Sequence, residues 1–155
     1  MAKNDKKAAT ARSAAVEIVQ QVLGEGAYTN IAVNKYLRSH ELSDMDRRLM
    51  TELVYGTVKA VGTIDWYLQQ CVTRPLDKID KLVLSILRIS VYQLLYMDKI
   101  PASAACNEAV NLARLFSHEG TAKFVNGVLR GLLRKKDSFT FPDKEKETAD
   151  YISLA

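Results

Sequence analysis

The chain has few of the residues, and none of the long apolar runs, that mark secreted, disulfide-bonded or membrane-spanning proteins. Its two cysteines, Cys71 and Cys106, form neither a metal-binding pattern nor a disulfide framework, so we expect both to be free thiols of a cytosolic protein. The N-terminus carries charges but no apolar signal core, which argues against secretion. The longest apolar run, from Leu82 to Met97, is interrupted by Arg88, so we expect no contact with a membrane.

Glycine and proline are also scarce, with seven and three residues among 155. Apolar positions recur with the spacing of a helix, and no segment shows the two-residue period of a strand. Without strands, a glycine-rich phosphate loop of the kind that follows a strand is excluded. Because 48% of the residues are apolar, the chain can bury one sizeable core. The sequence therefore predicts an all-α fold, a bundle of six or seven helices with short connections.

The expected helices cover most of the chain between residues 8 and 136. Thr29 and Ser43 precede apolar-periodic segments and are expected to cap them, whereas Gly24 is expected to end the first helix. In the helix after Ser43, Met45 is expected to face the core. Asp77 is expected to begin the most apolar helix. The predicted ranges are 8–23, 29–38, 44–61, 63–72, 78–97, 101–117 and 121–134.

The net charge of +4 conceals an asymmetry along the chain. Residues 1–136 contain 20 Lys/Arg against 13 Asp/Glu, whereas residues 137–155 contain 2 against 5. A basic body indicates a nucleic-acid partner, although a charge that serves only solubility explains it equally well. We interpret the acidic residues 137–155 as a linker toward a further domain and residues 1–7 as a flexible N-terminus. The chain is therefore expected to be part of a longer protein.

The last predicted helix combines an apolar stripe with a polar face and two glycines. The polar positions are three, four and four residues apart, so they share one face: Lys123, Asn126, Arg130 and Arg134. Gly127 and Gly131 lie beside this face, and each costs about 1 kcal/mol relative to alanine in a helix interior. That cost is understandable if a ligand or another backbone approaches closely. Two interpretations stay open: a site for phosphate or a base edge, or glycines that admit a neighbouring helix and cations that favour the helix C-terminus.

No catalytic constellation is visible in the sequence. The two histidines, His40 and His118, fall in predicted loops, where histidines are more often surface residues than ligands. Neither cysteine lies in a redox or nucleophile motif. The residues alone therefore indicate a basic, all-α binding domain without a metal or a cofactor of its own.

Four stretches together resemble the NusB family. They are the N-terminal helix with Arg12, "DMDRRLMTELVYGTV" (44–58), "LRISVYQLLYMDKIPASAACNEAVNLA" (87–113) and "AKFVNGVLRGLLR" (122–134), in the order of the family. The resemblance implies an all-α double helical bundle that binds RNA through the N-terminal helix and the "KFVNGVL" helix. It also allows a homodimer, because the family includes dimers. The RNA-contacting residues that we expect are Arg12, Arg48, Lys123, Asn126, Arg130 and Arg134, with Lys6 and Lys7 as further candidates.

Within this family the sequence resembles one type of member more than the other. The free-standing type is a transcription antitermination factor that binds RNA with ribosomal protein S10. The other type is the N-terminal domain of RsmB/Sun-type 16S rRNA cytosine-C5 methyltransferases. "DRRLMTELVYGTVK" and "VNGVLRGLLR" are more similar to the second type, since the factor tends to have Asp where Arg130 stands. The N-terminus also lacks the dense arginine cluster typical of the factor.

The methyltransferase resemblance implies a division of labour between two domains. Its catalytic domain is an α/β unit that binds S-adenosylmethionine and uses cysteines, and none of these features is expected in this chain. Cys71 and Cys106 match no catalytic motif. The chain would instead hold 16S rRNA near the active site of the missing domain. An open reading frame of roughly 430 codons or more would fit a two-domain enzyme, whereas one ending near Ala155 would favour the factor.

Overall fold

The computed structural model describes residues 9–139, and every regular element within that range is helical. The all-α prediction is therefore confirmed. Short π-helical or 3₁₀ turns, η1 (Gln20–Gly24), η2 (Leu76–Lys78) and η3 (Lys136–Ser138), accompany the α-helices. The α-helices are α2 (Ala11–Val19), α3 (Thr29–Ser39), α4 (Asp44–Lys59), α5 (Val61–Gln69), α6 (Lys81–Tyr96), α7 (Ala102–Phe116) and α8 (Glu119–Lys135).

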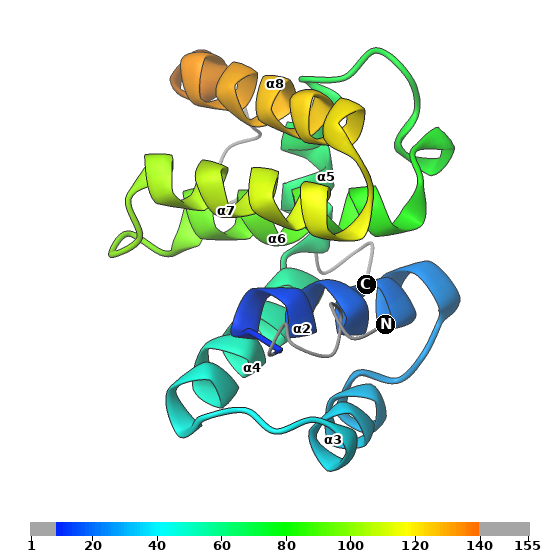
Figure 1. Cartoon of the computed structure of the whole chain (residues 1–155). Coiled ribbons are helices and arrows are strands. Elements are labelled where there is room, and N and C mark those ends of the chain that lie inside the picture. Colours follow the sequence, from blue (N-terminus) through cyan, green and yellow to red (C-terminus); the bar gives the residue numbers. More distant parts are fainter. Residues whose placement is uncertain (1–8, 140–155) are drawn as a thin grey trace, which may run out of the picture.

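The helices form two groups that meet at α6 (Figure 1). One group contains α2, α3 and α4, and α2 packs against both α4 and α6. The other contains α5, α6, α7 and α8, with α7 packed between α6 and α8. Helix α6 contacts members of both groups, and its side chains Ile86, Leu87 and Ile89 are fully buried. This is the double bundle that the resemblance implied.

The start of α6 differs from the prediction. Asp77 was expected to begin this helix, but it lies in the 3₁₀ turn η2. Asp80 begins it instead, because its carboxylate accepts the main-chain N–H groups of Leu82 and Val83 at 3.1 and 3.2 Å. Asp77 and Asp80 are three residues apart and have the same side chain, so the sequence alone does not show which of them caps α6.

Other helix boundaries were predicted with mixed success. Ser43 caps α4 as expected, because its hydroxyl accepts the N–H of Asp46 at 3.1 Å. The prediction for Thr29 is wrong, since the cap residue of α3 is Tyr28 and no side chain bonds there. The first helix continues as the π-helical turn η1, and the left-handed residue that follows is Gly26, at φ 83°, rather than Gly24.

The core face of α4 starts one turn later than predicted. Met45 is 72% exposed, so its predicted inward orientation is wrong. The fully buried side chains of this helix begin at Met50 and continue with Leu53 and Val54. Arg48 lies on the exposed face, as the sequence indicated.

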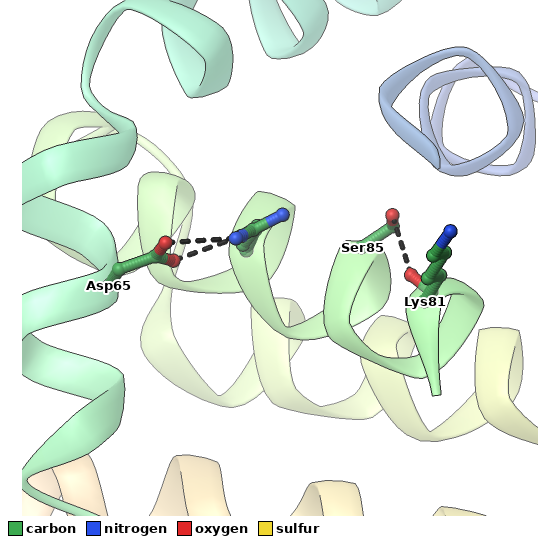
Figure 2. A network of polar contacts seen from close by, with 4 residues as sticks. Asp65, Lys81 and Ser85 are labelled. Carbon is green, nitrogen blue, oxygen red and sulfur yellow. Dashed lines mark hydrogen bonds and ion pairs between the residues drawn. The ribbon is translucent and has the colours of Figure 1, made fainter. Parts of the chain in front are cut away.

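An ion pair joins α5 to α6 (Figure 2). The guanidinium of Arg88 donates through Nε and Nη2 to the two carboxylate oxygens of Asp65, at 2.9 and 2.8 Å. One turn earlier on α6, the Ser85 hydroxyl donates to the Lys81 carbonyl at 2.9 Å. The arginine side chain is only 14% exposed, so a carboxylate partner is needed to balance its charge. Arg88 is therefore occupied within the fold.

The packed region extends slightly past the predicted boundary at Lys136. Phe139 lies against two aromatic residues of α5, with its ring centroid 5.9 Å from those of both Trp66 and Tyr67. Trp66 is the single tryptophan of the chain. The predicted flexible N-terminus, with Lys6 and Lys7, and residues 140–155 of the predicted linker lie outside the described residues.

Close helix packing occurs at a different glycine from the ones predicted. A Cβ atom on Gly56 of α4 would overlap the ring and hydroxyl of Tyr92 on α6. A Cβ on Gly127 would meet nothing within 4 Å, and one on Gly131 would meet only Nη2 of Arg134, at 3.7 Å. The interpretation that Gly127 and Gly131 admit a neighbouring helix of this chain is therefore wrong. Gly127 is exposed, so its outer face is open to a ligand, whereas Gly131 is buried.

A half-buried carboxylate lies near two stacked rings. The rings of Tyr36 and His40 are parallel to within 5°, with centroids 3.8 Å apart. Burial raises the pKa of Glu17 on α2, and His40 opposes that shift. Burial and then Glu17 raise the pKa of Tyr36 to about 12. This environment therefore disfavours the charged form of Glu17 relative to water.

We predict opposite effects for alanine at two glycines. Gly56→Ala should lower the free energy of unfolding by about 1–3 kcal/mol, because the added methyl group displaces Tyr92. Gly127→Ala, the matched control, should raise it by about 1 kcal/mol through helix propensity alone. Urea unfolding of both variants measures the difference. A gain at both positions would show that the Tyr92 ring moves aside at little cost.

Glu17→Gln should stabilise the protein at neutral pH and not in acid. The folded pKa of Glu17 is raised, so its protonation supports folding below the unfolded pKa of about 4.3, and this support is lost as pH rises through the folded pKa. The variant and the parent should therefore unfold alike below about pH 4 and diverge above it. Thermal melts across this range, with exposed Glu41→Gln as control, measure the effect. A constant difference at all pH values would contradict this assignment.

Candidate nucleic-acid interface

A polar groove of about 510 Å³ runs between α7 and α8. We call it the α7/α8 groove. Helix α7 contributes three polar residues at helical spacing, Asn107, Asn111 and Arg114. Helix α8 contributes the others: Glu119, Lys123, Asn126 and Arg130. Three of the residues that the sequence predicted to contact RNA therefore lie together in one open groove.

The groove exists because the two helices bury small and branched residues beneath it. Ala109 and Ala113 of α7 are buried, and so are Ala122 and Val125 of α8. Small side chains let the two helices approach closely, so that the longer polar side chains of α7 and α8 line the two sides of the groove. The predicted inward stripe of α8 is confirmed for Val125, Val128, Leu129 and Leu132, which are at most 6% exposed.

Positive charge dominates the groove. At one end, Arg114 and Glu119 form an exposed ion pair, with Nε 2.8 Å from Oε1. This hydrogen bond raises the pKa of Arg114 and lowers the pKa of Glu119. Lys123 and Arg130 have no carboxylate within ion-pair distance among the described residues. The groove thus holds three cations against one carboxylate, and two of the cations are not balanced.

Asn126 and Arg130 form a pair of donors facing the groove. The Nε of Arg130 donates to Oδ1 of Asn126 at 3.3 Å, one turn apart on α8. This bond orients both side chains and leaves the amide NH₂ and the guanidinium Nη groups without a partner among residues 9–139. A guanidinium beside an amide can bind a phosphate oxygen and a base edge at once.

The remaining predicted RNA-binding residues lie elsewhere. Arg134 is exposed in the last turn of α8, outside the groove lining. Arg48 is exposed on α4, and Arg12 is half-buried on α2. In Figure 1, α6 and α7 lie between α8 and these two helices. The structure therefore brings Lys123, Asn126 and Arg130 together and places Arg12 and Arg48 on the other helix group. That these five residues and Arg134 contact RNA stays a prediction.

Sequence reasoning missed a second cationic feature on α8. The guanidinium of Arg74 lies 5.3 Å from the ring centroid of Phe124, which is a cation–π contact. The two side chains line both of two smaller hollows, of about 350 and 330 Å³. Gly127 lines the second hollow, and Lys123 lines both this hollow and the α7/α8 groove. No periodic pattern marks Arg74, because it lies in the connection between α5 and η2.

Residues 9–139 do not present the features of a metal site, a reactive thiol or a membrane span. No cluster of three or more His, Cys, Asp or Glu side chains could hold a metal ion in this range. Burial raises the pKa of both Cys71 and Cys106, which disfavours the reactive thiolate. Among the helices described, none has the length and apolar character needed to span a bilayer.

The fold and the groove define the class of this protein as a helical binding domain of the double-bundle type. Comparison with protein families agrees, since the NusB family model matches residues 9–134. The chain belongs to the NusB family, and the resemblance stated from the sequence is confirmed.

Individual relatives show which members the chain is similar to. It is 40% identical over 129 residues to the probable ribosomal RNA small subunit methyltransferase B of Bacillus subtilis, covering 83% of this chain but only 29% of that relative. It is 32% identical to the transcription antitermination protein NusB of Ruminiclostridium cellulolyticum, covering 76% of this chain and 82% of that protein. Among solved structures, NusB and NusE in complex with dsRNA aligns with TM-score 0.72 at 20% identity, covering 80% of this chain and 93% of the matched chain. That structural likeness concerns the fold alone.

Proposed function

We propose that this chain is the RNA-binding domain of a 16S rRNA (cytosine-C5) methyltransferase, and that it holds rRNA near a catalytic domain that lies outside the chain. The observation that carries the RNA-binding proposal is the α7/α8 groove with its two unbalanced cations, Lys123 and Arg130. Phosphates are the partners that such cations favour, because neutralising them releases counterions.

The comparisons support RNA as the ligand. One solved structure with the same fold, NusB with NusE, is a complex with double-stranded RNA. The groove is polar and open, which suits a hydrated phosphate backbone better than a small apolar ligand. Amides from Asn107, Asn111 and Asn126 line it beside the cations, so base edges could be contacted as well.

The methyltransferase context rests on similarity and coverage. The Bacillus subtilis relative shares 40% identity and is matched over 29% of its length, which leaves room for a catalytic domain in that relative. Its cofactor would be S-adenosylmethionine, bound in that other domain. This chain would contribute proximity, by reducing the freedom of the bound RNA relative to the active site.

A free-standing antitermination factor is the alternative function. The Ruminiclostridium cellulolyticum protein favours it, because this chain covers 82% of the length of that factor. The factor would bind RNA together with ribosomal protein S10. The length of the natural open reading frame separates the two proposals.

Removing two cations of α8 should weaken RNA binding. The double variant Arg130→Ala and Arg134→Ala should lower the affinity for 16S rRNA fragments and reduce the salt slope by about one for each phosphate that is no longer neutralised. The control removes the same charge from α3, at exposed Lys35 and Arg38. Filter binding at two salt concentrations, with circular dichroism to verify folding, makes the comparison. Equal losses of affinity in both double variants would mean that only total charge matters, and unchanged affinity in both would refute the RNA site on α8.

The chain alone should not transfer methyl groups. Within residues 9–139 there is no strand-based nucleotide fold for S-adenosylmethionine. Incubation with labelled S-adenosylmethionine and small-subunit rRNA should leave the RNA unlabelled. Label transfer that depends on the chain would overturn the division of labour proposed above.

A further inference from the structure

Arg12 is held in the fold by a neutral group rather than by a carboxylate. Its Nε donates to Oε1 of Gln93 on α6 at 3.0 Å. Two other arginines with side-chain partners have acids there instead: Arg88 bonds Asp65, and Arg114 bonds Glu119. Within the described residues no acid lies within ion-pair distance of Arg12. Arg12 is therefore fixed in place while its charge stays unbalanced.

The orientation of Gln93 is fixed on both sides. The side chain is 2% exposed, so both polar atoms of its amide need partners. Its Nε2 donates to the main-chain carbonyl of Ile89 at 3.0 Å, one turn earlier on α6. With the amide nitrogen engaged there, the amide oxygen is the acceptor that remains for Arg12. Because α6 is the central helix, this acceptor is rigidly placed.

The backbone that carries Arg12 is also fixed. Arg12 follows Thr10, which begins α2 in a capping box with Ser13. The Thr10 hydroxyl accepts the N–H of Ser13 at 3.1 Å, and the Ser13 hydroxyl accepts the N–H of Thr10 at 3.0 Å. The backbone position of Arg12 is therefore fixed, and its guanidinium has one fixed contact, the hydrogen bond to Gln93. Its Nη groups have no partner among residues 9–139.

A purely structural link between α2 and α6 would not require a neutral acceptor. A carboxylate in the same place would bond Arg12 more strongly, since it would add the attraction between opposite charges to the hydrogen bond. It would also cancel the charge of Arg12. The amide keeps the link and preserves the charge, which is the combination that a phosphate ligand needs.

We propose that Gln93 is a positioning residue for RNA binding: it holds Arg12 in a fixed orientation with its charge uncompensated, so that the Nη groups can bind a phosphate. This inference rests on the proposed RNA-binding function. It concerns the α2 side of the molecule, where the resemblance already implied RNA contact through Arg12, and this side is separate from the α7/α8 groove. RNA bound at both would span the two helix groups across α6 and α7.

The test compares variants that keep or remove the charge of Arg12. Gln93→Glu should balance the charge and lower RNA affinity by the same factor as Arg12→Ala, with the salt slope reduced by about one in both. The double variant should show no loss of affinity beyond either single change. Gln93→Leu removes the acceptor but keeps the charge, so it should weaken binding while leaving the salt slope unchanged. Thermal melts of each variant, and filter binding at two salt concentrations, give the readouts.

The outcomes separate this inference from the proposed function. If the α8 double variant weakens binding while Arg12→Ala does not, RNA is held on the α8 side alone and Gln93 is only a structural link. If Arg12→Ala weakens binding and Gln93→Glu leaves affinity and slope unchanged, the positioning role is refuted. If neither the α8 nor the Arg12 variants affect binding, RNA is held elsewhere and both proposed sites are refuted; if the unchanged chain does not bind RNA, the proposed function itself fails. Gln93→Glu could melt below the assay temperature, because its carboxylate faces the Ile89 carbonyl. In that case Gln93→Leu and Arg12→Ala are compared instead. Weaker binding by Gln93→Leu with an unchanged salt slope supports the positioning role, and unchanged affinity of Gln93→Leu refutes it.

Discussion

The enclosure of α6 by other helices is the constraint on which the rest of the structure depends. This helix contacts α2, α4, α5, α7 and α8, so each buried polar group on it must find a partner inside the protein. Ser85 and Ser90 donate back to carbonyls of their own helix. Arg88 reaches Asp65 on α5, and Gln93 reaches Arg12 on α2. The polar side chains of the most buried helix thus tie together the elements around it, and both helix groups take their positions from it.

The α7/α8 groove lies one layer away from that centre, and its chemistry is set by different requirements. The buried sides of α7 and α8 use small and branched residues, whereas their outer edges are free to carry amides and cations. Lys123 connects the groove with the hollow beside Gly127, so the cationic surface continues over α8 rather than ending at one edge. A flexible, extended ligand would meet cations on both sides of this helix.

Much of the fold could be predicted from periodicity, because helices with one apolar face follow directly from residue spacing. The cap at Ser43 and the inward stripe of α8 were predictable for this reason. Asp77 and Met45 were misplaced because their roles depend on where a helix starts relative to its neighbours, which spacing within one segment does not determine. Gly127 and Gly56 could not be told apart for a similar reason. The sequence shows that each lacks a side chain, but only the packing shows whether another helix occupies the space beside it. For the site, spacing found the polar line of α8, whereas Arg74 came from a loop and the Arg12–Gln93 bond joins residues 81 positions apart.

The contact of Phe139 with Trp66 and Tyr67 has a practical consequence for protein engineering. The end of the predicted domain at Lys136 would be a natural place to truncate the chain or to fuse another protein. A junction placed there would delete an aromatic side chain that packs against α5, although it removes no residue of an α-helix. Fusions and minimal domains should therefore retain the segment through Phe139. Because the neighbouring indole is the single tryptophan of the chain, its emission spectrum offers a direct quality check on any such boundary.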